Sequence, residues 1–180
     1  MPHAPRPTSH RTLTARTFAA VVTTWAVWIL VVPAMIDRDL ASGPVSVAAA
    51  LTYRIAGMVC HQDGSRSFHV GRWPLPVCAR CTGLYLGAVC GALAGLGLGR
   101  RTSRGAARTP VPLRAVRLVL LVAALPTGAL WLTEWVFSEP VSNTVRAAAG
   151  IPLGAAVSWT AALAILGVTM TDNPHAPGVD

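Results

Sequence analysis

The chain has 180 residues, of which 53% are hydrophobic and 12% charged, and its formal net charge is +8. Soluble domains carry about 25% charged residues, so this composition argues against a soluble globular protein. The mean hydropathy of +0.52 points the same way. The positive charge does not indicate nucleic acid binding, because the arginines stand between long apolar runs, a pattern that controls membrane topology.

Four apolar runs are long enough to cross a membrane, which takes roughly 20 residues in a helix. They cover about residues 18–36, 82–99, 116–137 and 147–170. The first run is longer than the core of a signal peptide and has no small-residue cleavage site after it, so we expect an uncleaved helix. We therefore predict an all-α integral membrane protein with four transmembrane helices. They form a single domain over 18–170, between tails at 1–17 and 171–180.

Residues 44–59 form a shorter apolar stretch, which Arg54 interrupts. A run of this length is more typical of an interfacial or re-entrant helix than of a full span. We expect one such helix before the second span, where it would bring Cys60 to the end of the helix bundle.

The arginines predict the orientation in the membrane. The basic tail 1–17 and the Arg-rich loop 100–115 contain no acidic residue. Short loops rich in arginine stay in the cytoplasm, and two spans between these segments place both on that side. We therefore expect a multi-pass protein of the cell membrane with cytoplasmic N- and C-termini, and with the segment 60–81 outside the cytoplasm.

Three of the four cysteines lie in this outer segment. Cys78 and Cys81 form a C-x-x-C pair directly before the second span, and Cys60 with His61 stands upstream. Two ligand pairs from separate segments are typical of a structural zinc site. We predict a Zn²⁺ site with Cys60, His61, Cys78 and Cys81 as ligands, and with His69 as the alternative to His61. The site is structural, or catalytic if one position is left to water.

Two other interpretations of the cysteines stay open. Arg80 inside the C-x-x-C pair and the helix N-terminus after it both favour thiolate, as in a membrane thiol-disulfide oxidoreductase. A purely structural disulfide from Cys60 to one of the pair would need no catalytic role outside the cytoplasm. C-type haem attachment is excluded, because Thr82 and not histidine follows the second cysteine. We expect Cys90, inside the second span, to be a small core residue.

Polar residues elsewhere are candidates for a site on the same side. Glu134 lies near the outer end of the third span, where an ionisable group is a functional candidate. Arg66 stands between two serines and could hold an anionic group such as a phosphate. These two residues are our catalytic candidates, although the sequence does not decide whether the protein is an enzyme. Arg146 opens the fourth span, where a cation is unfavourable, so we expect it to have a partner, Glu134 or a bound anion. The further polar candidates are Gln62, Ser67, Arg80, Asn143 and Arg146.

Glycine recurs every four residues in the second span, at Gly83, Gly87, Gly91, Gly95 and Gly99. On a helix, this spacing makes one smooth stripe that lets another helix backbone approach closely in lipid. We expect this glycine stripe to pack within the bundle or to serve a homo-oligomer. The lipid bilayer is the other predicted partner.

The motifs CHQ, RS and PVCARCTGLYLG, followed by SNTVRAAAGIPLG, resemble a family of small bacterial and archaeal integral membrane proteins with a domain of unknown function. The resemblance spans about residues 55–155. It implies a helical membrane fold and no settled activity. Members often carry an acidic residue followed by glycine in the third helix, and the nearest counterpart here is Glu134 followed by Trp135. The family pattern falls on Cys60, His61, Gln62, Arg66, Ser67, Cys78, Arg80, Cys81, Gly83, Tyr85, Gly87, Asn143, Arg146 and Gly150.

Overall fold

The computed structural model describes residues 9–38, 42–103, 111–137, 141–168 and 170–171, with side chains of 9 and 99–103 left out. The first part of the N-terminal tail, residues 104–110 of the Arg-rich loop, and nearly all of the C-terminal tail therefore lie outside the described residues.

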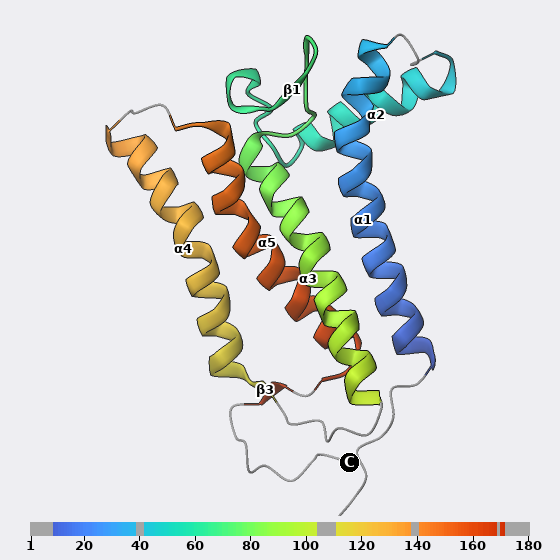
Figure 1. Ribbon diagram of the computed structural model, residues 1–180, viewed down its shortest axis with the longest axis vertical. Helices are drawn as coiled ribbons and strands as arrows, with labels where there is room; N and C mark the ends of the chain where they lie inside the picture. Colours follow the sequence, from blue (N-terminus) through green and yellow to red (C-terminus); the bar gives the residue numbers. More distant parts are fainter. Residues whose placement is uncertain (1–8, 39–41, 104–110, 138–140, 169, 172–180) are drawn as a thin grey trace, which may run out of the picture.

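Four long helices run side by side through the molecule (Figure 1). They are α1 (Ser9–Asp37), α3 (Ala79–Ser103), α4 (Leu113–Phe137) and α5 (Asn143–Ile165). Each is long and apolar enough to cross a membrane. Large apolar side chains are exposed on these helices, and in a bilayer they face lipid instead of water. The prediction of an all-α membrane protein with four spans is confirmed.

The fifth helix, α2 (Pro44–Gly57), is the short one expected before the second span. Figure 1 shows it beside the C-terminal end of α1. The indole Nε1 of Trp28 on α1 donates a 2.7 Å hydrogen bond to Oγ1 of Thr52, which is buried on α2. Val47, Leu51 and Ile55 recur every four residues and are more than half exposed. Such an apolar stripe on a short helix suits the membrane interface.

Two small pairs of strands close the ends of the bundle. At the α2 end, a 3-10 turn (Gly64–Arg66) is followed by β1 (His69–Val70) and β2 (Trp73–Pro74), which pair antiparallel. The hairpin turns at Gly71, which has a φ of 58°. Glycine adopts this left-handed conformation without the steric penalty that other residues meet. At the opposite end, β3 (Val111–Pro112) pairs in parallel with β4 (Met170–Thr171).

The closest helix contact joins α3 to α5, and the glycine stripe forms it. A methyl group at Gly83, Gly87 or Gly91 would overlap a backbone carbonyl of α5. The three carbonyls belong to Ala147, Ile151 and Ala155. The partner of the stripe in this structure is therefore α5 of the same chain. The surroundings of Gly99 are not among the described features.

Adding a methyl group at the stripe is expected to destabilise the protein. Gly87→Ala would force α3 away from α5, and overpacking of this kind costs about 1–3 kcal/mol. Gly97→Ala is the matched control, because nothing lies within 4 Å of its Cβ position. The melting temperature of the purified protein in detergent measures both variants. A Gly87→Ala variant that melts at or above the wild-type temperature would contradict this account of the contact.

Candidate metal centre

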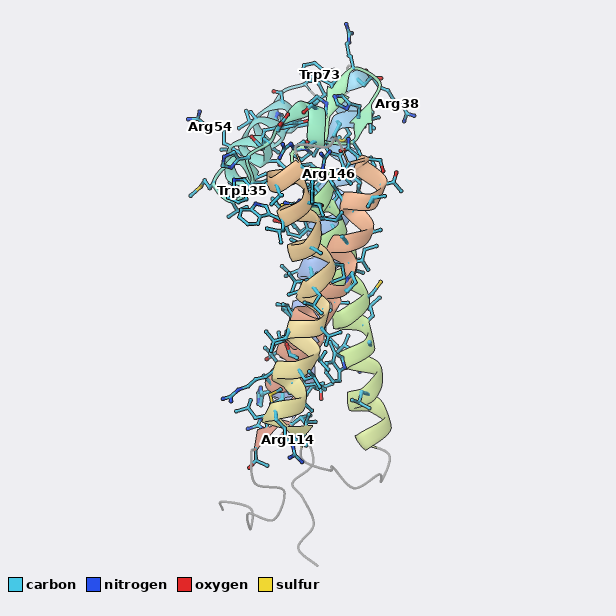
Figure 2. All side chains as sticks on the ribbon, turned by 90° about the vertical axis from the view of Figure 1, so that its left-hand side faces the viewer. Arg38, Arg54, Trp73, Arg114, Trp135 and Arg146 are labelled. Atoms are coloured by element: carbon cyan, nitrogen blue, oxygen red, sulfur yellow. The ribbon has the colours of Figure 1, made fainter. Side chains whose placement is uncertain are left out.

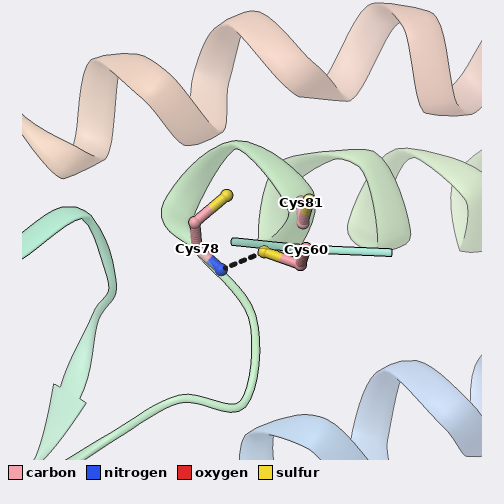
Figure 3. Close-up of side chains that lie close together, drawn as sticks. All are labelled: Cys60, Cys78 and Cys81. Carbon is pink, nitrogen blue, oxygen red and sulfur yellow. Dashed lines mark hydrogen bonds between the residues drawn. The ribbon is translucent and has the colours of Figure 1, made fainter. Parts of the chain in front are cut away.

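Cys60, Cys78 and Cys81 come together at the start of α3 (Figure 3). Their three Sγ atoms all lie within 4.8 Å of one another. The backbone N–H of Cys78 also donates a hydrogen bond to Sγ of Cys60, with an N–S distance of 3.2 Å. All three are free thiols in this structure. Two segments separated by the hairpin thus deliver three sulfur ligands to one place, and this group could hold a metal ion.

Local backbone geometry places each cysteine. After α2 the chain makes one more turn, in which the N–H of Cys60 donates to the carbonyl of Ala56 over 2.9 Å. Cys78 precedes α3, and its carbonyl accepts the first helical hydrogen bond from the N–H of Thr82, also at 2.9 Å. Cys81 follows three residues later, so its side chain and that of Cys78 lie on the same face of the first turn.

The sulfur group lies in an apolar environment. Cys60 is 8% exposed and belongs to a buried cluster with Ile29, Ala56 and Val77. The aromatic rings of Trp25 and Tyr85, which meet edge to face, pack against the same cluster. These side chains exclude water from one side of the thiols and limit their movement.

The pKa of the Cys78 thiol lies below that of a free cysteine. Hydrogen bonding from the Cys81 thiol, together with N–H groups of Cys81 and Arg80 in the first turn of α3, lowers the pKa of Cys78 to about 5. The N-terminus of a helix favours the charged form of a cysteine for the same reason. A metal binds the thiolate and not the thiol, so this environment is compatible with Cys78 as a ligand.

Gln62 joins the two segments that carry the cysteines. Its side-chain Nε2 donates to the carbonyl of Tyr53 on α2 at 2.6 Å and to the carbonyl of Pro76 at 2.8 Å. The backbone of Gln62 adopts a φ of 49°, which is uncommon for a residue with a side chain. The sequence identified Gln62 only as a polar candidate. Its clamp between α2 and the residue two before Cys78 was missed, because no spacing rule signals a contact to backbone carbonyls.

Neither predicted histidine joins the sulfur group. His61 follows Cys60 directly, yet its side chain is exposed, and His69 is exposed on β1. Among the described residues, the group that could hold a metal contains the three cysteines and no histidine or carboxylate. Cys90 lies further along α3 and is exposed, so it is not the core residue that we expected.

A second polar cluster involves the same turn of α3. Glu134 on α4 pairs with Arg146 of α5 (Oε1 to Nε, 2.6 Å) and with Arg80 of α3 (Oε2 to Nη2, 3.1 Å). The Glu134 side chain is 8% exposed. Arg146 therefore has the carboxylate partner that its position at a helix start required, and Figure 2 shows it where α4 and α5 meet. This buried ionic cluster ties together the ends of α3, α4 and α5 that lie near the cysteines.

Arg80 and the two thiols project from the start of α3 in different directions. Cys78 and Cys81 point towards Cys60, whereas Arg80 between them reaches Glu134 on α4. On a helix, a residue between two positions three apart faces away from their common side. Both carboxylate oxygens of Glu134 accept hydrogen bonds from guanidinium groups, one from Arg80 and the other from Arg146. A catalytic role for Glu134 stays a prediction.

The remaining polar candidates lie in the loop between α2 and α3 and at the start of α5, and Asn143 connects the two. The side-chain amide of Asn143 donates to the carbonyl of Ser67 at 3.0 Å, and its Oδ1 accepts from Arg146 at 2.9 Å. Ser67 is buried, and its hydroxyl donates to the carbonyl of Asp63. Arg66 pairs with the carboxylate of Asp63 at 3.5 Å, with about half of each side chain exposed. The catalytic role predicted for Arg66 is likewise untested.

Comparison with known proteins places this architecture in a family. Residues 60–160 match a family described as "Predicted membrane protein (DUF2085)". An uncharacterized protein of Methanothermobacter thermautotrophicus is 31% identical over 97 residues, which cover 53% of this chain and 78% of that protein. No solved structure matches the chain. The matched region contains the three clustered cysteines and most of α3, α4 and α5, so the chain belongs to the DUF2085 family of membrane proteins.

Proposed function

We propose that this membrane protein binds one zinc ion through Cys60, Cys78 and Cys81. The observation that carries the proposal is the convergence of three sulfur atoms within 4.8 Å. Zinc–sulfur bonds of about 2.3 Å in a tetrahedral site place sulfur atoms about 3.8 Å apart. The observed cluster is close to that spacing, so small side-chain rotations are enough to form the site.

Three protein ligands leave the fourth position of a tetrahedral zinc ion to another group. Structural zinc sites are closed by four protein ligands, whereas catalytic sites have three and keep one position for water or substrate. Because no fourth protein ligand joins the sulfur group among the described residues, the arrangement favours the open type. Zinc in such a site would act as a Lewis acid or supply a bound hydroxide.

A thiol-disulfide oxidoreductase is the second candidate, and one observation favours it. The lowered pKa of Cys78 would make it a good nucleophile toward a disulfide, with Cys81 or Cys60 as resolving thiol. The two functions differ in metal content and in redox behaviour. An oxidoreductase would cycle between dithiol and disulfide in a glutathione buffer and would copurify without stoichiometric zinc.

The proposal includes an orientation, with the cysteines outside the cytoplasm and both chain termini inside. Its support is the distribution of charge. Arg11, Arg16, Arg114 and Arg117 lie at the end of the bundle where α1 and α4 begin, and no acidic residue accompanies them in 1–17 or 100–117. At the cysteine end, arginines alternate with acidic residues such as Asp37, Asp63 and Glu134. Arginine-rich ends stay in the cytoplasm.

Metal analysis of the purified protein tests the zinc proposal. Wild type is expected to carry about one zinc ion per chain, and Cys78→Ser and Cys60→Ser to lose nearly all of it. Cys90→Ser is the matched control, because this thiol lies outside the cluster, and it should keep its zinc. Zinc in the wild type should also raise the melting temperature, and a chelator should remove that increment. Wild type free of metal after purification with zinc present would sink the proposal.

Removing the Gln62 clamp is expected to weaken zinc binding without removing a ligand. Gln62→Met keeps the size of the side chain but loses both donated hydrogen bonds, so Cys60 is held less firmly relative to Cys78. Loss of a group that orients a metal ligand typically lowers the metal affinity about 10–100-fold. Competition with a chromophoric chelator measures the change, and His61→Ala, which alters an exposed neighbour, is the control. Equal affinity in Gln62→Met and wild type would show that the clamp does not position the site.

Reporter fusions test the orientation. Green fluorescent protein fused to the C-terminus is expected to fluoresce, because it folds in the cytoplasm, while alkaline phosphatase inserted at the Gly71 turn is expected to be active outside it. The opposite pair of results would show that the protein has the inverse orientation, with the cysteines in the reducing cytoplasm.

A further inference from the structure

An apolar groove of about 810 Å³ opens between α3, α4 and α5. Its walls run from Cys90 to Ala94 on α3, from Leu118 to Pro126 on α4, and from Pro152 to Trp159 on α5. Among the residues that the structure describes, no charged side chain lines it. The glycine stripe keeps α3 against α5, whereas α4 contacts mainly α5, which leaves the space between α3 and α4 open.

One arginine stands at the end of this groove. On α4, the groove residues Leu118, Val122 and Pro126 recur every four positions, and such residues lie above one another on one face of a helix. Arg114 is the preceding member of that series and is exposed. Figure 2 shows it at the far end of α4 from Trp135. Arg117 lies one turn on, also exposed, and neither arginine has an ion-pair partner in the part of the chain that the structure describes.

The dimensions suit one leaflet of a bilayer. At 1.5 Å per residue, the groove wall on α4 begins about 6 Å from Arg114 and ends about 18 Å from it. Half of the hydrocarbon core is about 15 Å thick. A lipid whose phosphate lies on the Arg114 guanidinium would therefore extend its acyl chain through the whole groove.

We infer that the groove between α3, α4 and α5 binds an anionic phospholipid, with its phosphate on Arg114 and Arg117 and one acyl chain along Leu118 to Pro126. Charge decides the class of lipid. The segment 100–117 contains no acidic residue, and the start of α4 adds the positive end of a helix. Arginine binds phosphate bidentately, and basic sites at helix ends recruit anionic headgroups. This site is independent of the cysteines and of the proposed zinc ion.

Trp159 in the groove wall serves as the reporter. The full chain is reconstituted in phosphatidylcholine vesicles that contain a small fraction of either brominated phosphatidylglycerol or brominated phosphatidylcholine. The chain has six tryptophans. The signal from the groove is therefore the difference in fluorescence quenching between wild type and Trp159→Phe. We expect the anionic lipid to quench this signal at a concentration about 25-fold lower, because each of the two arginines near the surface contributes about fivefold.

The double variant Arg114→Gln/Arg117→Gln is expected to abolish the preference, and Ala94→Phe, which fills the groove, to reduce quenching by both lipids. Arg54→Gln, at the other end of the molecule, is the control and should keep the preference. Equal quenching by the two lipids in wild type, or a preference that survives in the double variant, would overturn the inference. Quenching by neither lipid, together with Cys90 disulfide dimers on oxidation, would place a second copy in the groove and overturn it equally.

Discussion

The backbone contact between α3 and α5 is the constraint on which the rest of the bundle depends. Glycines at Gly83, Gly87 and Gly91 bring the two helices so close that carbonyls of α5 fill the space of the missing side chains. In lipid, helices gain little from burying apolar surface, so close van der Waals packing of this kind supplies the association. With α5 fixed on one side, α3 presents another face to α1.

The first turn of α3 shows what this central position achieves. Its Cys78 and Cys81 side chains face Cys60, while Arg80 reaches across to α4. A single turn therefore carries two of the three sulfur atoms and one of the three residues of the ionic cluster that joins α3, α4 and α5. A displacement of α3 would disturb the two together. This shared support explains why the residues of the C-x-R-C motif stand so close in the sequence while their side chains belong to different clusters.

The sequence was sufficient to predict the four spans, the short helix before the second span and the meeting of Cys60 with the C-x-x-C pair. Apolar length and ligand spacing are local signals, which explains this success. The histidines were harder, because adjacency of His61 to Cys60 says nothing about where its ring points. The Gln62 clamp and the pairing of Arg80 with Glu134 depend on tertiary contacts between distant segments. The partner of the glycine stripe could likewise not be chosen from the stripe alone.

The order of the elements has a consequence for biogenesis. All three clustered cysteines lie before Thr82, whereas the helix that covers the glycine stripe begins at Asn143. Because the ribosome makes the chain from its N-terminus, the thiols can gather while α5 is still unsynthesised and the stripe faces lipid or the insertion machinery. A nascent chain stalled after α3 would already contain all three clustered cysteines. The glycine stripe of α3 would still lack its α5 partner, so it would be accessible to insertion chaperones.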